Sequence, residues 1–116
     1  MAKEIKKDDN KIKRGTKNVF ADLGYSDPDT HLLKAQLVGR IDEIMTDKKL
    51  TQTQAAQVMG ITQPDVSRLL KGQFRDVSVE RIMRMLTRLG CEVDIVVKSP
   101  GRKRAGFVIH LQNASA

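Results

Sequence analysis

Two short helix signals separated by one glycine occupy residues 51–72, TQTQAAQVMGITQPDVSRLLKG. The first begins at Thr51, which has Gln54 at the spacing of a capping box, and the second begins in the same way at Thr62. Gly60 ends the first helix, because glycine adopts the positive φ of a helix C-terminus without steric cost. The second helix follows almost at once. Because few folds accommodate so tight a connection, the pattern predicts a helix-turn-helix.

The second helix of this pair, which we expect to run to about Lys71, has one apolar and one polar face. Ile61, Val66 and Leu69 recur at a spacing that buries them beneath the helix. In helix-turn-helix proteins the second helix enters the DNA major groove. Its outward side chains here are polar or basic and suit contacts with bases and phosphates: Gln63, Ser67, Arg68 and Lys71.

Two further helices are predicted around the pair. The Asp-Pro-Asp segment at 27–29 has the N-cap, the proline and the acidic first turn of a helix start, and apolar residues continue at helical spacing to about Asp47. Ser78 begins another helix, whose apolar residues repeat until Gly90. The expected fold is mainly α, a repressor-like bundle of about four or five helices.

The apolar period changes to two in residues 91–98 and 106–112, which predicts a C-terminal β-strand or hairpin. A lone hairpin is marginal in water, so these strands must pack on the helices or pair with another subunit, and the sequence leaves both open. We therefore divide the chain into a flexible basic N-terminal tail at 1–17, a helix-turn-helix domain at 18–90 with its recognition helix at about 62–71, and a C-terminal dimerisation element at 91–116.

The net charge is +7, from 21 Lys and Arg against 14 Asp and Glu. Positive charge is concentrated in residues 1–17, 48–90 and 98–104, with acidic stretches between them. Such blocks suit contact with a polyanion at several places, although basic tails also serve solubility alone. In the basic turn, Arg102, Lys103 and Arg104 are interpreted as solvated, with contact to the DNA backbone or minor groove as the alternative.

Several protein classes are disfavoured by what the sequence lacks. Cys91 has no partner for an internal disulfide, the first residues contain no apolar leader, and no stretch is apolar enough to span a membrane. These features favour a cytoplasmic protein. His31 and His110 are too far apart in sequence to have metal-ligand spacing. Because no nucleophile–base–acid set or phosphate loop is found, we predict no enzyme activity, no metal and no cofactor.

The helix pair resembles the helix-turn-helix of the phage repressor and Cro type, the XRE family. The segment TQTQAAQVMGITQPDVSRLLKG has Thr-Gln, a small residue, Gly, an apolar residue, Gln and Val-Ser at the family's spacings. The wider frame, residues 18–97, is similar to small XRE-type antitoxins of the HigA kind from toxin–antitoxin pairs. NVFADLG precedes the long first helix, SVERIMRMLTRLG follows the recognition helix, and CEVDIVV closes the frame.

The resemblance implies roles for individual side chains. Gln52 matches the position that contacts a phosphate and braces the base-contacting glutamine, which is Gln63 in this chain. The amide of Gln63 can bond adenine N6 and N7 together, and Arg68 suits either guanine or a phosphate. Asp65 would repel phosphate, so we interpret it as a cap of its own helix. The other positions implied to face DNA are Thr62, Pro64 (through apolar contact), Ser67 and Lys71, followed by Gln73 and Arg75 in a loop that either contacts phosphates or is solvated.

We predict a sequence-specific DNA-binding repressor that binds a palindromic operator as a homodimer, because one motif contacts too few base pairs to select a site in a genome. The resemblance further implies an antitoxin that represses its own operon and binds a cognate toxin of the RelE/HigB kind. Two alternatives stay open. One is a phage-type or general XRE regulator without a toxin, and the other is a protein-interaction module that no longer binds DNA.

Overall fold

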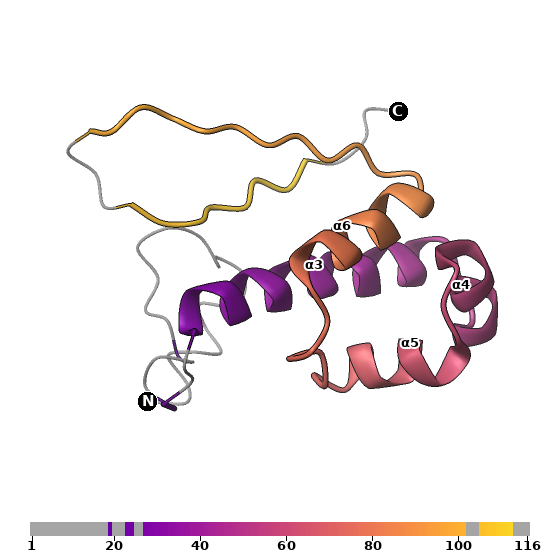
Figure 1. Ribbon diagram of the computed structural model, residues 1–116. Coiled ribbons are helices and arrows are strands. Elements are labelled where there is room, and N and C mark those ends of the chain that lie inside the picture. The colour runs from indigo at the N-terminus through magenta and orange to yellow at the C-terminus, as the bar shows by residue number, and fades with distance from the viewer. Residues whose placement is uncertain (1–18, 20–22, 25–26, 102–104, 113–116) are drawn as a thin grey trace. The chain divides into compact units, whose positions relative to one another are not determined.

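The computed structural model describes residues 19, 23–24, 27–101 and 105–112, and these divide into two units. Residues 37–99 belong to one unit, and the flanking residues belong to the other. The described part contains four helices, labelled in Figure 1: α3 (Pro28–Asp47), α4 (Gln52–Met59), α5 (Gln63–Leu70) and α6 (Val79–Arg88). The prediction of a mainly helical fold with a helix-turn-helix is confirmed. The predicted tail at 1–17 and the basic side chains at 102–104 lie outside the described residues.

Each predicted helix start carries the cap expected from the sequence. The Thr51 hydroxyl accepts a hydrogen bond from the Gln54 N–H at 3.1 Å, and the Gln54 side chain accepts one from the Thr51 N–H at 2.8 Å, which completes a capping box. Thr62 caps α5 through the N–H of its third residue at 3.2 Å, and Ser78 caps α6 in the same way at 3.1 Å. Local side chains therefore fix where all three short helices begin.

The core of the unit at 37–99 forms where the apolar faces of its helices meet. Helix α4 contacts both α5 and α6. Ile41 of α3, Val66 of α5 and Ile82 of α6 are the largest fully buried side chains. The remaining buried apolar residues of this core are Leu37, Val38, Ile44, Met45, Ala55, Ala56, Met59, Leu69, Phe74, Met85, Leu86 and Leu89.

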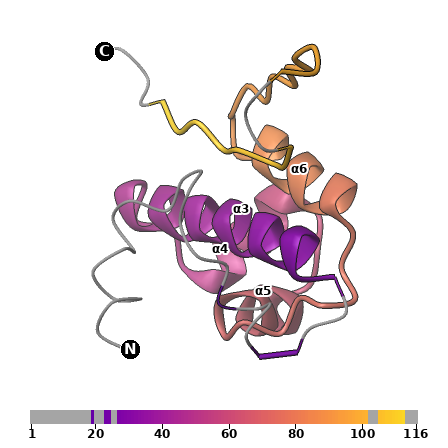
Figure 2. The ribbon, with the colours of Figure 1, turned by 90° about the vertical axis from the view of Figure 1, so that its left-hand side faces the viewer.

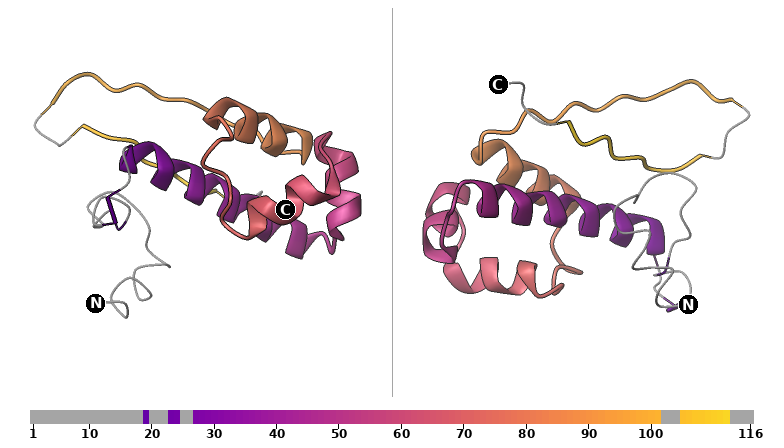
Figure 3. Two further views of the ribbon diagram at one scale, coloured as in Figure 1. Left: turned by 60° about the horizontal axis from the view of Figure 1, so that its bottom comes forward. Right: turned by 180° about the vertical axis from the view of Figure 1, so that it is seen from behind.

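Helix α5 lies at one margin of this unit, below α3 and α6 in Figure 1. The perpendicular view in Figure 2 and the view from behind in Figure 3 place α5 at the same margin. Val66 and Leu69 hold its inner face in the core, with 0% and 2% of their surface exposed. The opposite face is therefore turned away from the other helices, as a recognition helix requires.

The end of α6 is held by two sets of hydrogen bonds. The Gly90 and Cys91 N–H groups bond the Thr87 and Leu86 carbonyls, both at 3.0 Å, and Gly90 has a φ of +100°, which together form a Schellman motif. The Lys48 ammonium donates to the Leu89 carbonyl at 3.2 Å from a distant part of the sequence. A cation at this position also interacts favourably with the helix dipole.

The predicted strands are not found in the described residues: 91–101 and 105–112 have no regular secondary structure. The alternation of apolar residues at 91–98 was a correct observation, but strands form only when their backbone groups bond a neighbouring edge. In the described chain that edge is absent, and Ile95, Val96 and Val97 are 73%, 74% and 89% exposed. The described residues are therefore helical without a strand, and the predicted C-terminal strand or hairpin is not supported.

Candidate DNA interface

A tight turn centred on Gly60 sets α5 against α4. Gly60 has a φ of +75° and a ψ of +31°, the left-handed conformation that ends α4. Its N–H and that of Ile61 both bond the Ala56 carbonyl, at 2.8 and 3.0 Å. The Arg88 guanidinium of α6 lies close by, with Nη1 only 3.2 Å from where a Cβ on Gly60 would stand. Glycine is therefore favoured here chiefly for its backbone angle, and the nearby guanidinium adds a weaker steric limit.

The face of α5 that points away from the core carries the polar side chains named by the sequence. Gln63, Pro64 and Arg68 are exposed, while Ser67 is half-buried. Thr62 is exposed at the N-cap, and Gln52 is half-buried at the start of α4. The structure thus gathers these predicted positions around one helix, and their contacts with bases or phosphates stay predictions.

Gln52 and Gln63 are joined by a hydrogen bond, as the resemblance implied. The Gln63 amide nitrogen Nε2 donates to the Gln52 oxygen Oε1 at 2.7 Å. An amide group has two N–H donors and a carbonyl acceptor, so Gln63 retains one N–H for adenine N7 and its oxygen for the adenine N6 amino group. Gln52, whose oxygen is occupied, still presents N–H donors suited to a phosphate. The pair therefore offers donors suited to one base, through Gln63, and to one phosphate, through Gln52.

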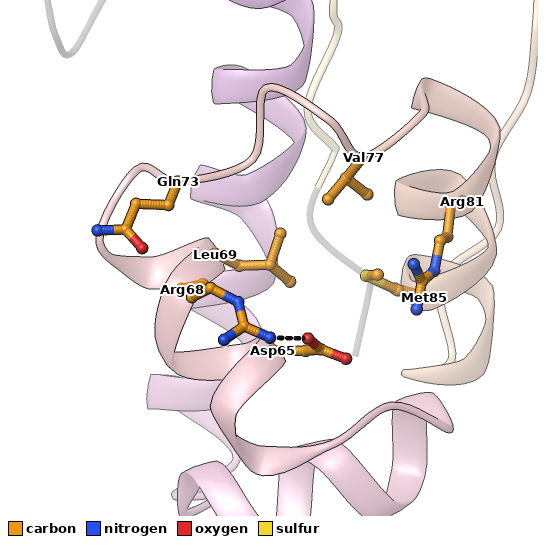
Figure 4. A pocket seen from close by; sticks show the side chains of 7 residues that line it. All are labelled: Asp65, Arg68, Leu69, Gln73, Val77, Arg81 and Met85. Carbon is orange, nitrogen blue, oxygen red and sulfur yellow. Dashed lines mark hydrogen bonds and ion pairs between the residues drawn. The ribbon is translucent and has the colours of Figure 1, made fainter.

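Asp65 and Arg68 form an ion pair one turn apart on the same helix, shown as a dashed line in Figure 4. The Arg68 guanidinium, followed by the Thr62 hydroxyl, holds the pKa of the Asp65 carboxyl below its ordinary value. Asp65 was interpreted as a cap of its own helix. The structure has Thr62 as the N-cap of α5, with its hydroxyl accepting from the Asp65 N–H, and Asp65 lies in the first turn. Its contact with Arg68 was not predicted.

The loop after α5 places the remaining predicted residues. The Gly72 and Gln73 N–H groups bond the Leu69 and Arg68 carbonyls at 3.0 and 2.9 Å, which closes the end of the helix. Phe74 is only 5% exposed and fixes the loop to the core. On either side of it the polar side chains are exposed, namely Lys71, Gln73 and Arg75.

Three features of the site were missed from the sequence: the core role of Phe74, the position of Arg88 beside Gly60, and the pairing of Arg68 with Asp65. Phe74 is an isolated aromatic residue in a polar loop, which is a usable signal for an anchoring side chain. The i, i+3 spacing of Asp65 and Arg68 also permits an ion pair on a helix. Arg88 comes from another helix, so no local pattern indicated it.

The surface around this helix offers little room for a small ligand. A hollow of about 40 Å³ lies between α5, the following loop and α6, and Figure 4 shows its lining. It has space for a few water molecules. In the part of the chain that the structure describes, no three His, Cys, Asp or Glu side chains are grouped to hold a metal ion. No helix within these same residues is long and apolar enough to cross a membrane.

The capped helix pair, the glycine turn and the outward polar face define a helix-turn-helix protein of the DNA-binding regulator class. Comparison with known families agrees: residues 19–98 match the helix-turn-helix domain family HTH_37. The chain belongs to this family. It is also similar to a solved structure of a protein named as an XRE family transcriptional regulator, with 33% sequence identity and a TM-score of 0.66 over 76% of this chain and 99% of that one. No curated protein matches the chain.

Proposed function

We propose that this protein is a repressor that binds a palindromic DNA operator as a homodimer through the outer face of α5. The observation that carries the proposal is the Gln52–Gln63 hydrogen bond of 2.7 Å, which orients an exposed amide for an adenine edge. The net charge of +7 supports attraction to DNA, and Arg68 of α5 and Lys71 at its C-cap add donors.

Selection of bound duplexes from a random DNA pool tests the proposal directly. We expect an enriched palindrome with half-sites separated by about one helical turn, roughly 34 Å. Failure to enrich any sequence, with the protein folded and monodisperse, contradicts sequence-specific binding. Enrichment of a single half-site contradicts the homodimer instead.

Gln63→Ala tests the base contact. On the selected operator we expect a loss of about 1–3 kcal/mol and a relaxed preference at one base pair, because a bidentate amide contact is removed. Gln57→Ala is the matched control, since Gln57 is an exposed glutamine of α4 outside the predicted contacts. Fluorescence anisotropy on operators varied at each position provides the measurement. Equal affinity of the Gln63 variant and the wild type would rule out the assigned role.

The proposed dimer is supported by the apolar residues that one chain leaves in water. Ile95, Val96 and Val97 are consecutive and strongly exposed, and Phe107 and Leu111 are 62% and 54% exposed. Burying a side chain of this size is worth about 1.5–3 kcal/mol. Pairing with the same segment of a second copy would also satisfy the backbone groups of an extended chain.

Sedimentation of variants tests this interface. We expect Val97→Asp to shift the protein toward monomer, because a carboxylate would be buried in an apolar contact. Thr53→Asp introduces the same charge at an exposed polar position of α4, outside residues 91–116, and should leave the association unchanged. A wild-type protein that sediments as a monomer at every concentration overturns the dimer.

We further propose that the regulator is the antitoxin of a toxin–antitoxin pair. This step is supported by the resemblance of residues 18–97 to HigA-type proteins. An adjacent reading frame of about 100 codons for a basic protein would supply the RelE/HigB-like toxin. Co-expression and co-purification of that product with this chain tests the assignment. We expect the product alone to arrest growth and this chain to relieve the arrest. If the neighbouring product neither arrests growth nor co-purifies with this chain, the alternative of an XRE regulator without a toxin is favoured.

A further inference from the structure

The ion pair between Asp65 and Arg68 places a negative charge on the helix proposed to bind DNA. The side chain of Arg68 is 55% exposed and that of Asp65 is 33% exposed. Asp65 lies in the first turn of α5, two residues after Gln63, and its carboxylate borders the hollow that Figure 4 shows between α5 and α6. The guanidinium is therefore held along its own helix in the DNA-free protein.

A guanidinium in this position has two competing kinds of acceptor. Asp65 engages Nη2 of Arg68, whereas a guanine requires two donors on one edge of the group for its O6 and N7 atoms. A phosphate offers two anionic oxygens and, like the carboxylate that it would replace, can be bound by two donors of a guanidinium. A phosphate therefore competes with a nearby carboxylate of the same sign of charge, which also repels it. The neutral O6 and N7 atoms of a guanine are not repelled in this way, and they can use the guanidinium donors other than the Nη2 group that bonds Asp65.

We propose that Asp65 is a specificity-determining residue of this DNA interface, because it competes with phosphates for Arg68 and lowers affinity for duplexes that lack the matching base. This inference rests on the proposed DNA-binding function. The Asp65 carboxyl is charged at neutral pH, as the competition requires, and Arg68 lowers its pKa further below the ordinary value.

Asp65→Asn tests the proposal, because it removes the charge and preserves the shape of the side chain. The probes are a duplex of randomised sequence and the operator from the selection, each titrated over a range of salt concentrations. We expect affinity for the random duplex to rise about fivefold and the salt dependence to steepen by about one unit of slope. Affinity for the operator should change by less than about twofold, so the ratio of the two affinities falls.

Two controls separate competition for Arg68 from a general charge effect. Asp47→Asn, an exposed position at the end of α3, makes the same change in net charge and should leave the ratio unchanged. In an Arg68→Ala background, Asp65→Asn should have no more effect than Asp47→Asn. If Asp65→Asn raises affinity for the random duplex equally with Arg68 present and in the Arg68→Ala background, the proposal is overturned. An equal loss of affinity on both duplexes also overturns it, because Asp65 would then only hold Arg68 in place.

The wild-type titrations separate this inference from the function beneath it. If the wild-type protein binds neither duplex, both proposals are overturned. If it prefers the operator and Asp65→Asn leaves the ratio of the two affinities unchanged, only this inference is overturned. Thermal unfolding confirms that each variant is folded. Asp65→Ser, which retains a side-chain acceptor in the first turn of the helix, replaces Asp65→Asn if that variant is unstable.

Discussion

Gly60 is constrained by its backbone and by a neighbouring side chain. Its φ of +75° is costly for any residue with a Cβ, by about 1–2 kcal/mol. The Arg88 Nη1 atom at 3.2 Å adds a steric limit from a different helix. Because a guanidinium is the far end of a flexible side chain, it can move aside, so the backbone contributes the larger part of the constraint.

Gly60→Ala and Gly39→Ala are therefore expected to have opposite effects on the free energy of unfolding. Gly60→Ala should lower it by about 1–2 kcal/mol. Gly39 lies inside α3, where an added Cβ meets nothing within 4 Å, so Gly39→Ala should raise it by about 0.5–1 kcal/mol. Urea denaturation measures both. A Gly60→Ala variant as stable as the wild type would show that the left-handed angle is not needed at this turn.

The double variant Gly60→Ala/Arg88→Ala separates the two constraints. Removing the guanidinium relieves crowding but leaves the positive φ. We expect most of the Gly60→Ala loss to persist in the Arg88→Ala background. If Gly60→Ala instead costs no stability in the Arg88→Ala background, the constraint comes from Arg88.

At the scale of the helix, the end of α3 uses a left-handed conformation at a residue that is not glycine. Lys49 has a φ of +57°, the one positive value at a residue other than glycine among those described. The Lys49 and Leu50 N–H groups bond the Thr46 and Met45 carbonyls at 3.1 and 2.9 Å, which is the Schellman pattern with lysine in the glycine position.

Lys49→Gly should raise the free energy of unfolding by about 1 kcal/mol, because glycine adopts this conformation without a Cβ clash. Lys49→Ala is the matched control, since alanine removes the same charge and retains the Cβ, and it should change stability by less than about 0.5 kcal/mol. Thermal unfolding at one protein concentration compares the three proteins. Equal stabilisation by both substitutions would attribute the gain to loss of the charge.

Helix starts were predictable from this sequence because capping is local. Thr51, Thr62 and Ser78 each bond an N–H within their own first turn, so the pattern contains the whole interaction. The polar face of α5 followed from the same periodicity. Long-range contacts were not predictable: Lys48 reaches the Leu89 carbonyl across 41 residues of sequence, and neither end of that bond has a local signature.

At the scale of the molecule, the expected strands depended on a partner edge that one chain does not supply. Alternating apolar residues indicate that a segment is suited to a sheet, but not where its hydrogen-bonding neighbour lies. Ile95 and Val97 are consistent with a strand that forms on association. The same argument supports the proposed homodimer, which would fix the distance between two copies of α5.

If the proposed dimer fixes that distance, DNA affinity depends strongly on the spacing of the operator half-sites. Inserting about five base pairs between the half-sites turns them to opposite sides of the duplex, and we expect affinity to fall to that of a single half-site. The same insertion outside the palindrome should have no effect. Gel-shift titration of the three duplexes provides the comparison. Equal affinity for all of them would mean that each copy binds independently.

The last turn of α6 takes part in two junctions. Arg88 lies beside the glycine that orients α5, and the Leu89 carbonyl is bonded by Lys48 immediately before the exposed segment that begins near Cys91. A substitution that displaces this turn alters the entry angle of α5 and the exit direction of that segment together. Variants of α6 therefore cannot be assigned to DNA affinity or to self-association by one assay, and both quantities have to be measured on the same sample.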